Sequence, residues 1–305
     1  YPVAELPLRE LVDATYKIPV AYVTEATWIS DHLNTSYGHE VALVRNGIRK
    51  DVYRTMGPTM APRDPNRQPR VLVEGHFGVS FKNTALGVRL AREAGAKDIW
   101  VLTGTPIKWI PGVSRVFSRV PINVTPEIYR SCDILVKLST VEGMFGPPLE
   151  IFHCGGTAIV FDVTGHNEYI VDVQNACVVR RGDMDGVVTT LRRLLSDRTE
   201  LARLQAGALQ TAAVWASWDE SSSAFCGWVE TSLVGPAVDR TVLAELSDKA
   251  FAEYARDEQL RLANAPRVRR HRLSALAARF PPPLLRSLKQ LEAASEVLFG
   301  PREVR

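Results

Sequence analysis

Between residues 71 and 233 the hydrophobic positions fall into short apolar runs separated by longer amphipathic stretches. Runs of this kind, rich in Val, Ile and Leu, are typical of strands buried on both faces of a parallel sheet. They predict strands at Val71–Glu74, Ile99–Thr103, Arg115–Ser118, Ile134–Lys137, Ala158–Asp162 and Ala176–Val179. The stretches between them predict helices at about Lys82–Ala94, Pro126–Ser131, Leu149–Cys154, Asn167–Val171 and Asp183–Ser196.

Strands that alternate with helices predict an α/β fold with a doubly wound, Rossmann-like parallel sheet. In such sheets ligands bind beyond the carboxyl ends of the strands. We therefore look for chemistry in the segments that follow each predicted strand.

The regions on either side of this domain have other patterns. Residues 1–54 predict helix, helix and strand, with a helix over Glu25–Ser36 capped by Thr24 and a strand at Val41–Val44, and we interpret them as the partial end of a first domain. Residues 55–70 hold four prolines and few apolar residues, which indicates a linker to the sheet domain at 71–233. Residues 234–305 predict a helical tail with helices at Leu243–Leu262 and Leu284–Leu298.

Composition and charge narrow the class of protein. With 46% hydrophobic and 23% charged residues the chain can fill a core and stay soluble, and its apolar runs are too short to cross a bilayer, so we expect a cytoplasmic protein. Four cysteines and six histidines lack the spacing of a metal site, so we expect no metal. The chain begins at Tyr1 and not at Met, and we expect further sequence upstream.

The tail is basic. From Arg261 to Arg305 there are ten Lys or Arg against three Asp or Glu, including the cluster Arg267–Arg272. The cluster is interpreted either as a contact to anionic membrane lipid, which would place the protein at the periphery of the inner membrane, or as a solvated linker face. A motif that reads nucleic acid is lacking, and we expect no nucleic-acid partner.

The segment from Lys137 to Glu150 follows a predicted strand and opens a helix. Gly143 and Gly146 let backbone approach a ligand closely, and prolines at 147 and 148 suit the first turn of a helix. Amides and the positive helix end at this edge form an anion site suited to a diphosphate.

Two carboxylates, Glu142 and Glu150, flank this loop. A carboxylate repels phosphate, but it accepts two hydrogen bonds from a vicinal diol. One diol on a ribose and one on a sugar would satisfy the pair. Either residue alone is better explained as an exposed side chain; together, around a Gly-rich turn, they favour a nucleotide-sugar site.

The spacing of Glu142 and Glu150, with seven residues between them, resembles the E-x7-E motif of retaining glycosyltransferases of the GT-B fold. This family is the mannosyl-, glucosyl- and rhamnosyltransferase group. Three further segments are similar to that family at the right spacing: Leu43–Ile48, Phe152–Val160 and Thr164–Ile170. The resemblance covers about residues 20–230. It implies that the sheet domain is the carboxy-terminal, donor-binding half of such an enzyme.

The resemblance implies a role for each matching position. Glu150 would bind the ribose hydroxyls, Glu142 would face the donor sugar, and the backbone of Gly143, Met144, Phe145 and Gly146 would hold sugar and diphosphate. Lys82 matches the phosphate-binding lysine after the first strand, in a loop that begins at Gly75. His76 stands where the family usually has arginine, and Ser139 would either touch the nucleotide or cap the loop. The catalytic residues are then Glu142 and Lys82.

We therefore expect transfer of a hexose or deoxyhexose, with retention and without a metal or cofactor, from a nucleoside diphosphate to a glycan or lipid-linked acceptor. Most of the acceptor half would lie upstream of residue 20. Two alternatives stay open: a GT-B-like sugar-nucleotide epimerase, which would convert its donor without an acceptor, and a non-catalytic module that only binds sugar nucleotide. A dinucleotide dehydrogenase is disfavoured because the sequence Gly75–Gly78 lacks the GxGxxG pattern.

Overall fold

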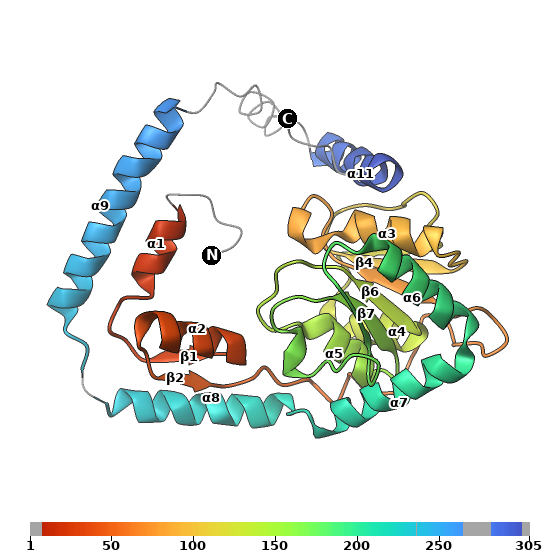
Figure 1. Ribbon diagram of the computed structural model, residues 1–305, viewed down its shortest axis with the longest axis horizontal. Coiled ribbons are helices and arrows are strands. Elements are labelled where there is room, and N and C mark those ends of the chain that lie inside the picture. The colour runs from red at the N-terminus through yellow and green to blue at the C-terminus, as the bar shows by residue number, and fades with distance from the viewer. Residues whose placement is uncertain (1–7, 236, 265–281, 301–305) are drawn as a thin grey trace. The chain divides into compact units, whose positions relative to one another are not determined.

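The computed structural model describes residues 8–235, 237–264 and 282–300 (Figure 1). The chain divides into two compact units. The first unit comprises Tyr1–Arg45 and Ser222–Phe280, and the second comprises Asn46–Ser221 and Pro281–Arg305.

The second unit holds a six-stranded parallel sheet with the order β5-β4-β3-β6-β7-β8. Its strands are β3 (Val71–Glu74), β4 (Ile99–Thr103), β5 (Arg115–Ser118), β6 (Ile134–Lys137), β7 (Thr157–Phe161) and β8 (Cys177–Val179). The expected doubly wound sheet is confirmed, and four of the six strands have the bounds that the apolar runs predict. The strand order reverses between β3 and β6, which pair in register from Val71–Ile134 to Val73–Val136.

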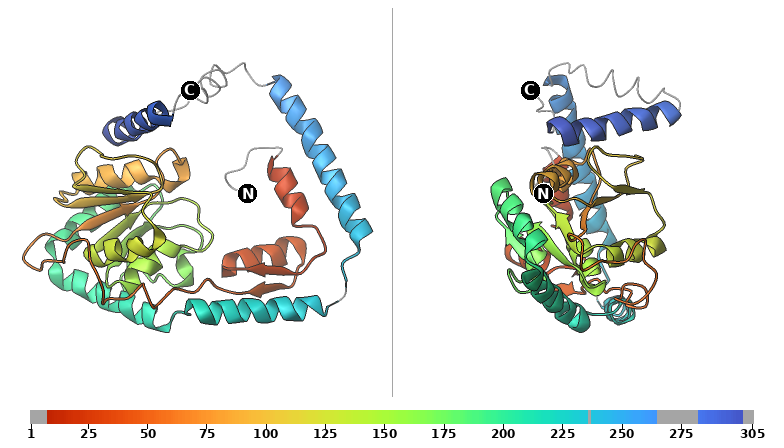
Figure 2. Two further views of the ribbon diagram at one scale, coloured as in Figure 1. Left: turned by 180° about the vertical axis from the view of Figure 1, so that it is seen from behind. Right: turned by 90° about the vertical axis from the view of Figure 1, so that its right-hand side faces the viewer.

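Helices cover both faces of this sheet (Figures 1 and 2). One face packs against Val88 of α3 and Leu191 of α6, and the other against Ile128 of α4 and Phe152 of α5. Both clusters are almost fully buried, as expected where β-branched strand residues meet apolar helix stripes. The helices are α3 (Thr84–Glu93), α4 (Thr125–Ser131), α5 (Gly146–His153), α6 (Met184–Ser196) and α7 (Arg198–Val214), with short 3-10 turns η1 (Ser80–Lys82), η2 (Ile122–Val124) and η3 (His166–Glu168).

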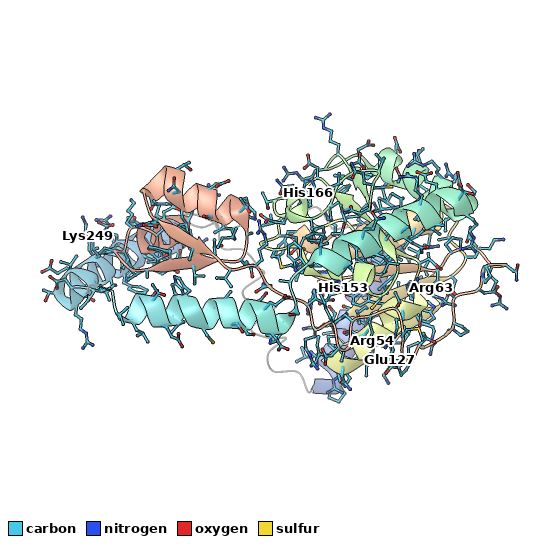
Figure 3. All side chains as sticks on the ribbon, turned by 90° about the horizontal axis from the view of Figure 1, so that it is seen from below. Arg54, Arg63, Glu127, His153, His166 and Lys249 are labelled. Carbon is cyan, nitrogen blue, oxygen red and sulfur yellow. The ribbon has the colours of Figure 1, made fainter. Side chains whose placement is uncertain are left out.

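Residues 55–70, predicted to be a linker, are part of the second unit, which begins at Asn46. The Arg63 guanidinium, labelled in Figure 3, donates to the carbonyls of Gly155 at 2.6 Å and Cys154 at 3.0 Å. The Met60 amide donates to Ser131 Oγ at 2.9 Å. Proline content indicated an extended path, but these bonds across α4 and α5 fix that path against the sheet domain.

The first unit is built from both ends of the chain. It holds a two-stranded parallel sheet of β1 (Tyr22–Thr24) and β2 (Val41–Leu43), together with α1 (Leu8–Thr15), α2 (Thr27–Tyr37) and the long α9 (Arg240–Asn264). α2 begins after Ala26, which makes no side-chain cap, so Thr24 is not its N-cap; Thr24 is the last residue of β1. α8 (Trp218–Leu233) carries the chain from the second unit into the first.

The tail is likewise divided between the units. The last helix, α11 (Pro282–Phe299), lies beside α3 (Figures 1 and 2) and buries Ala293 and Val297 in the core of the second unit. The single tail domain expected over 234–305 therefore differs from the structure, because an apolar stripe on its last helix completes the sheet domain. The Arg267–Arg272 cluster lies outside the described residues. Among the described helices, none combines the length and apolar character needed to span a membrane.

Candidate nucleotide-sugar site

The predicted site residues gather where the strand order reverses, beyond the carboxyl ends of β3 and β6. β3 leads through Gly75 and His76 to the η1 turn with Lys82, and β6 leads through Ser139 and Glu142 to α5. Two hydrogen bonds join these segments: the Thr140 amide donates to the Phe81 carbonyl, and Asn83 Nδ2 donates to the Leu138 carbonyl, both at 2.9 Å. Ligands of doubly wound sheets bind at this crevice.

Lys82 and Glu142 form a close ion pair. Lys82 Nζ lies 2.8 Å from Glu142 Oε1 and 2.9 Å from Oε2, and the two side chains are 24% and 11% exposed. The Thr164 hydroxyl also donates to the Glu142 carbonyl at 3.0 Å. The structure thus brings both predicted catalytic residues together.

A second ion pair lies beside the first. Lys137, the last residue of β6, donates to Glu74 Oε2 at 2.5 Å, and its Nζ lies 3.9 Å from Glu142 Oε1. Lys137 is 2% exposed. Glu74 did not figure among the expected site residues. The signal in the sequence was a charged residue ending an otherwise apolar strand, directly before Gly75.

Glu150 lies on α5 and receives a hydrogen bond from the Tyr129 hydroxyl of α4. Burial raises the pKa of Glu150 to about 7, and the charge of Glu74 adds to the rise, whereas Tyr129 and Lys137 oppose it. Tyr129 is 2% exposed, and its hydroxyl orients the carboxyl predicted to bind ribose.

The first loop depends on glycine. Gly75 has a φ of 152°, and a Cβ there would collide with the Thr84 hydroxyl. A Cβ on Gly78, in contrast, would meet open space. The exposed His76 ring lies against Gly104, the residue after β4, and leaves that glycine no room for a side chain. This loop is therefore shaped tightly at its start and open at its turn.

The second loop offers fewer amides than the sequence suggested. Residues 147 and 148 of α5 are prolines, which have no N–H, and the Gly146 amide donates to the Met144 carbonyl at 3.1 Å. The Phe145 ring is fully buried and the Phe145 carbonyl accepts from the Tyr169 hydroxyl, so neither group is available to a ligand. A Cβ on Gly146 would meet open space. Positive charge at this edge thus comes mainly from the lysines.

Ser139 is fully buried, and within the described part of the chain its hydroxyl has no hydrogen-bond partner. Buried hydroxyls are usually bonded, so an unbonded one at a candidate site is a candidate partner for a ligand group or water. Within the same residues, His, Cys, Asp and Glu side chains do not form a group of three or more suited to a metal ion.

The site as a whole combines three carboxylates with two lysines. Glu74, Glu142 and Glu150 can accept hydrogen bonds from hydroxyl groups, and Lys82 can neutralise a phosphate. An arrangement of this kind suits a ligand that carries both many hydroxyls and a diphosphate.

Comparison with known proteins agrees with this chemistry. Residues 113–211 match the family model described as glycosyl transferases group 1. No curated protein matches the chain.

Solved structures share the fold at low sequence identity. A glycosyltransferase from Rickettsia africae ESF-5 superposes with a TM-score of 0.61 at 13% identity, over 77% of this chain and 69% of its own. Sucrose-phosphate synthase from Thermosynechococcus elongatus gives 0.61 at 16%, over 76% and 64%. WaaG, a glycosyltransferase involved in lipopolysaccharide biosynthesis, gives 0.51 at 16%, over 66% and 60%.

The chain thus spans about two thirds of the length of these structures. The family match lies within the second unit and includes Lys137, Glu142 and Glu150. Residues 113–211 match the glycosyl transferases group 1 family, and the six-stranded unit that contains them has the fold of GT-B glycosyltransferases.

Proposed function

We propose that the second unit binds a nucleoside-diphosphate sugar and that the protein transfers the sugar, with retention of anomeric configuration, to a glycan or lipid-linked acceptor. The observation that carries the proposal is the ion pair of Lys82 with Glu142 at the point where the strand order reverses. This edge lies within or beside the segment that matches a glycosyltransferase family.

Each group has a distinct role in the proposed donor complex. Glu150 accepts hydrogen bonds from the ribose hydroxyls, with its carboxyl oriented by Tyr129. Glu142 accepts from hydroxyls of the donor sugar, and Lys82 contacts the diphosphate. The open space at Gly146 and Gly78 allows backbone to approach the phosphates, and Ser139 adds a buried hydroxyl. His76, unlike an arginine at this position, contributes no permanent positive charge to the phosphate site.

The proposed reaction separates charge. The bond between the sugar carbon and the diphosphate oxygen breaks, and its electron pair stays on the diphosphate. The acceptor oxygen bonds to the same carbon, and its proton goes to the departing diphosphate. Lys82 stabilises the negative charge that develops on the diphosphate. Electrostatic stabilisation of this kind is usually the largest contribution that a site makes to the rate. We therefore propose that the reaction uses Lys82 for this purpose and needs no metal or cofactor.

Calorimetric titration with UDP- and GDP-sugars tests the donor site, and dTDP-sugars, whose deoxyribose lacks the 2′-hydroxyl, serve as the comparison. We expect one nucleotide class to bind and Glu150→Ala to weaken the binding of that class at least tenfold, because a charged hydrogen bond to the ribose is lost. Equal binding by the variant would reject the ribose assignment. Incubation of donor without acceptor separates the alternatives, since an epimerase would convert the donor and a pure binding module would leave it unchanged in every assay.

A further inference from the structure

Lys137 and Glu74 form a buried ion pair that the proposed donor contacts do not use. They are the last residues of neighbouring strands β6 and β3, one position beyond the paired Val136 and Val73. Nζ and Oε2 are 2.5 Å apart, and Lys137 is 2% exposed. The preceding residues of both strands are apolar and fully buried.

An ion pair at such a position costs stability relative to apolar side chains. Removing two charges from water is expensive, and well-packed hydrophobic residues of similar volume are often at least as stable in their place. The pair therefore needs an explanation other than stability. Its position suggests one, since Lys137 Nζ also lies 3.9 Å from Glu142 Oε1.

Lys82 has two competing partners under the proposed function. In the structure both oxygens of Glu142 accept from Lys82 Nζ. A diphosphate would draw Lys82 away, and Glu142, at 11% exposure, would then be left as a poorly solvated charge. An unpaired buried carboxylate is costly, and the sugar hydroxyls proposed to bond Glu142 carry no charge, so a second cation would stabilise the carboxylate further.

We propose that Lys137 is a positioning residue that takes over Glu142 when Lys82 turns to the diphosphate. In the donor-free protein Glu74 holds Lys137, and in the complex Lys137 closes the 3.9 Å gap to Glu142. This inference rests on the proposed function. It makes the Glu74–Lys137 pair a device that sets diphosphate affinity without contacting the diphosphate.

The proposal predicts opposite effects for two variants. In Glu74→Gln, Lys137 loses its charged partner, turns to Glu142 and releases Lys82, so diphosphate binding tightens several-fold. In the double variant E74V/K137L both charges are gone and the strands stay apolar, so Glu142 depends on Lys82 alone. Diphosphate binding then weakens about tenfold, the effect of one lost charge-assisted contact.

The experiment uses the whole chain at pH 8.5, above the pKa of about 7 that burial gives Glu150 in the wild type. UDP, GDP and dTDP are titrated in turn into the wild type, and the one that binds is then titrated into the variants together with its parent nucleoside. We expect the nucleoside affinity to stay within about twofold throughout, because it reports Glu150 and not Lys82. The matched control is R193M/E200Q. It removes the Arg193–Glu200 ion pair, which joins α6 to α7 at 2.9 Å in the same unit.

The outcomes separate this inference from its basis. If wild type binds none of the diphosphates, the proposed donor site is wrong and the inference falls with it. If the diphosphate binds but Glu74→Gln leaves its affinity unchanged or lower, the inference alone is overturned. Parallel loss of nucleoside and diphosphate binding in the double variant would also overturn it, by assigning the pair a purely structural role. Should E74V/K137L unfold, Glu74→Gln still decides, since a structural role predicts weaker binding and the proposal predicts tighter.

Discussion

The carboxyl of Glu150 lies against the Tyr129 hydroxyl and near Glu74, in surroundings that disfavour its charge. Burial raises its pKa from 4.5 to about 7, and Glu74 contributes in the same direction. The proposed function needs the ionised form, because only a carboxylate accepts hydrogen bonds from both ribose hydroxyls. Donor binding and the stability of the fold therefore make opposite demands on this residue.

The first prediction concerns pH. An acid with a pKa near 7 is protonated below that value, so nucleotide affinity should rise as pH increases from 6 to 8 and level off above. Below pH 7 the loss should approach about tenfold per pH unit, the slope of one linked proton. Calorimetric titration of the parent nucleoside checks this, because it lacks phosphates that titrate. An equally steep slope in Glu150→Gln would assign the effect to another group.

The second prediction concerns stability at the same residue. The folded protein holds the Glu150 proton up to about pH 7, whereas the unfolded chain releases it near 4.5, so ionisation lowers the free energy of unfolding as pH rises through this window. Glu150→Gln carries no charge and should unfold at a higher temperature than wild type at pH 8. The gain is on the order of 1–3 kcal/mol at pH 8 and close to zero at pH 4.5.

Thermal unfolding at both pH values measures this difference. The variant should bind nucleotide more weakly while being more stable, a combination that marks a residue kept for binding. A Gln variant less stable than wild type at pH 8 would contradict the raised pKa.

At the scale of elements, the loop after β3 and the start of α5 use glycine for different reasons. Gly75 combines a φ of 152° with a collision between any Cβ and Thr84, whereas Gly146 has a Cβ position that opens to empty space. The first glycine is required by the fold. The second leaves room at the site, and we infer that a ligand uses this room.

The third prediction compares the two glycines. Gly75→Ala should lower the free energy of unfolding by about 1–3 kcal/mol, because the side chain is strained at this φ and clashes with Thr84. Gly146→Ala should leave stability within about 0.5 kcal/mol, as is usual away from the core, and still weaken donor binding, because the methyl occupies space proposed for the diphosphate. Denaturant unfolding and nucleotide titration of both variants test the pair. Unchanged donor affinity in Gly146→Ala would place the donor elsewhere.

At the scale of the whole chain, the described parts of the tail do not behave as one appendage. α9 belongs to the first unit, whereas α11 buries Ala293 and Val297 against the core of the second. The side chain of Gln290 on α11 also accepts from the Lys108 amide at 2.6 Å. The last helix is thus part of the sheet domain that carries the site.

The fourth prediction tests this assignment. Val297→Ala should lower the free energy of unfolding of the second unit by about 1–3 kcal/mol, because it removes two buried methyl groups from a packed core. Leu291→Ala on the same helix is the matched control, since Leu291 is 63% exposed, and it should change stability by less than about 0.5 kcal/mol. Denaturant unfolding of the full chain compares them. Equal effects at both positions would mean that α11 does not pack on α3.

Much of the fold follows from local pattern. Strands buried on both faces are mostly apolar, so the runs at 71–74, 99–103 and 134–137 marked β3, β4 and β6 at their observed bounds. The run at 115–118 marked β5, a partly exposed edge strand that contains Arg115 and Ser118. The site residues Lys82, Glu142 and Glu150 were equally visible, since each follows such a strand within one loop or turn. Boundaries with weaker signals shifted, as at α5, which begins at Gly146 and not at Leu149.

The sequence by itself determined the doubly wound sheet, the edge where its strands end, and the lysine and glutamates carried to that edge, because these depend on residues near one another in the chain. Only the tertiary structure decided that residues 46–70 and α11 pack on the sheet domain, and that Lys137 lies between Glu74 and Glu142. The hydrogen bond from the Tyr129 hydroxyl to Glu150 was likewise decided by the tertiary structure. Each of these contacts joins segments far apart in sequence, and their charges, pKa values and partners depend on distances that no local pattern encodes.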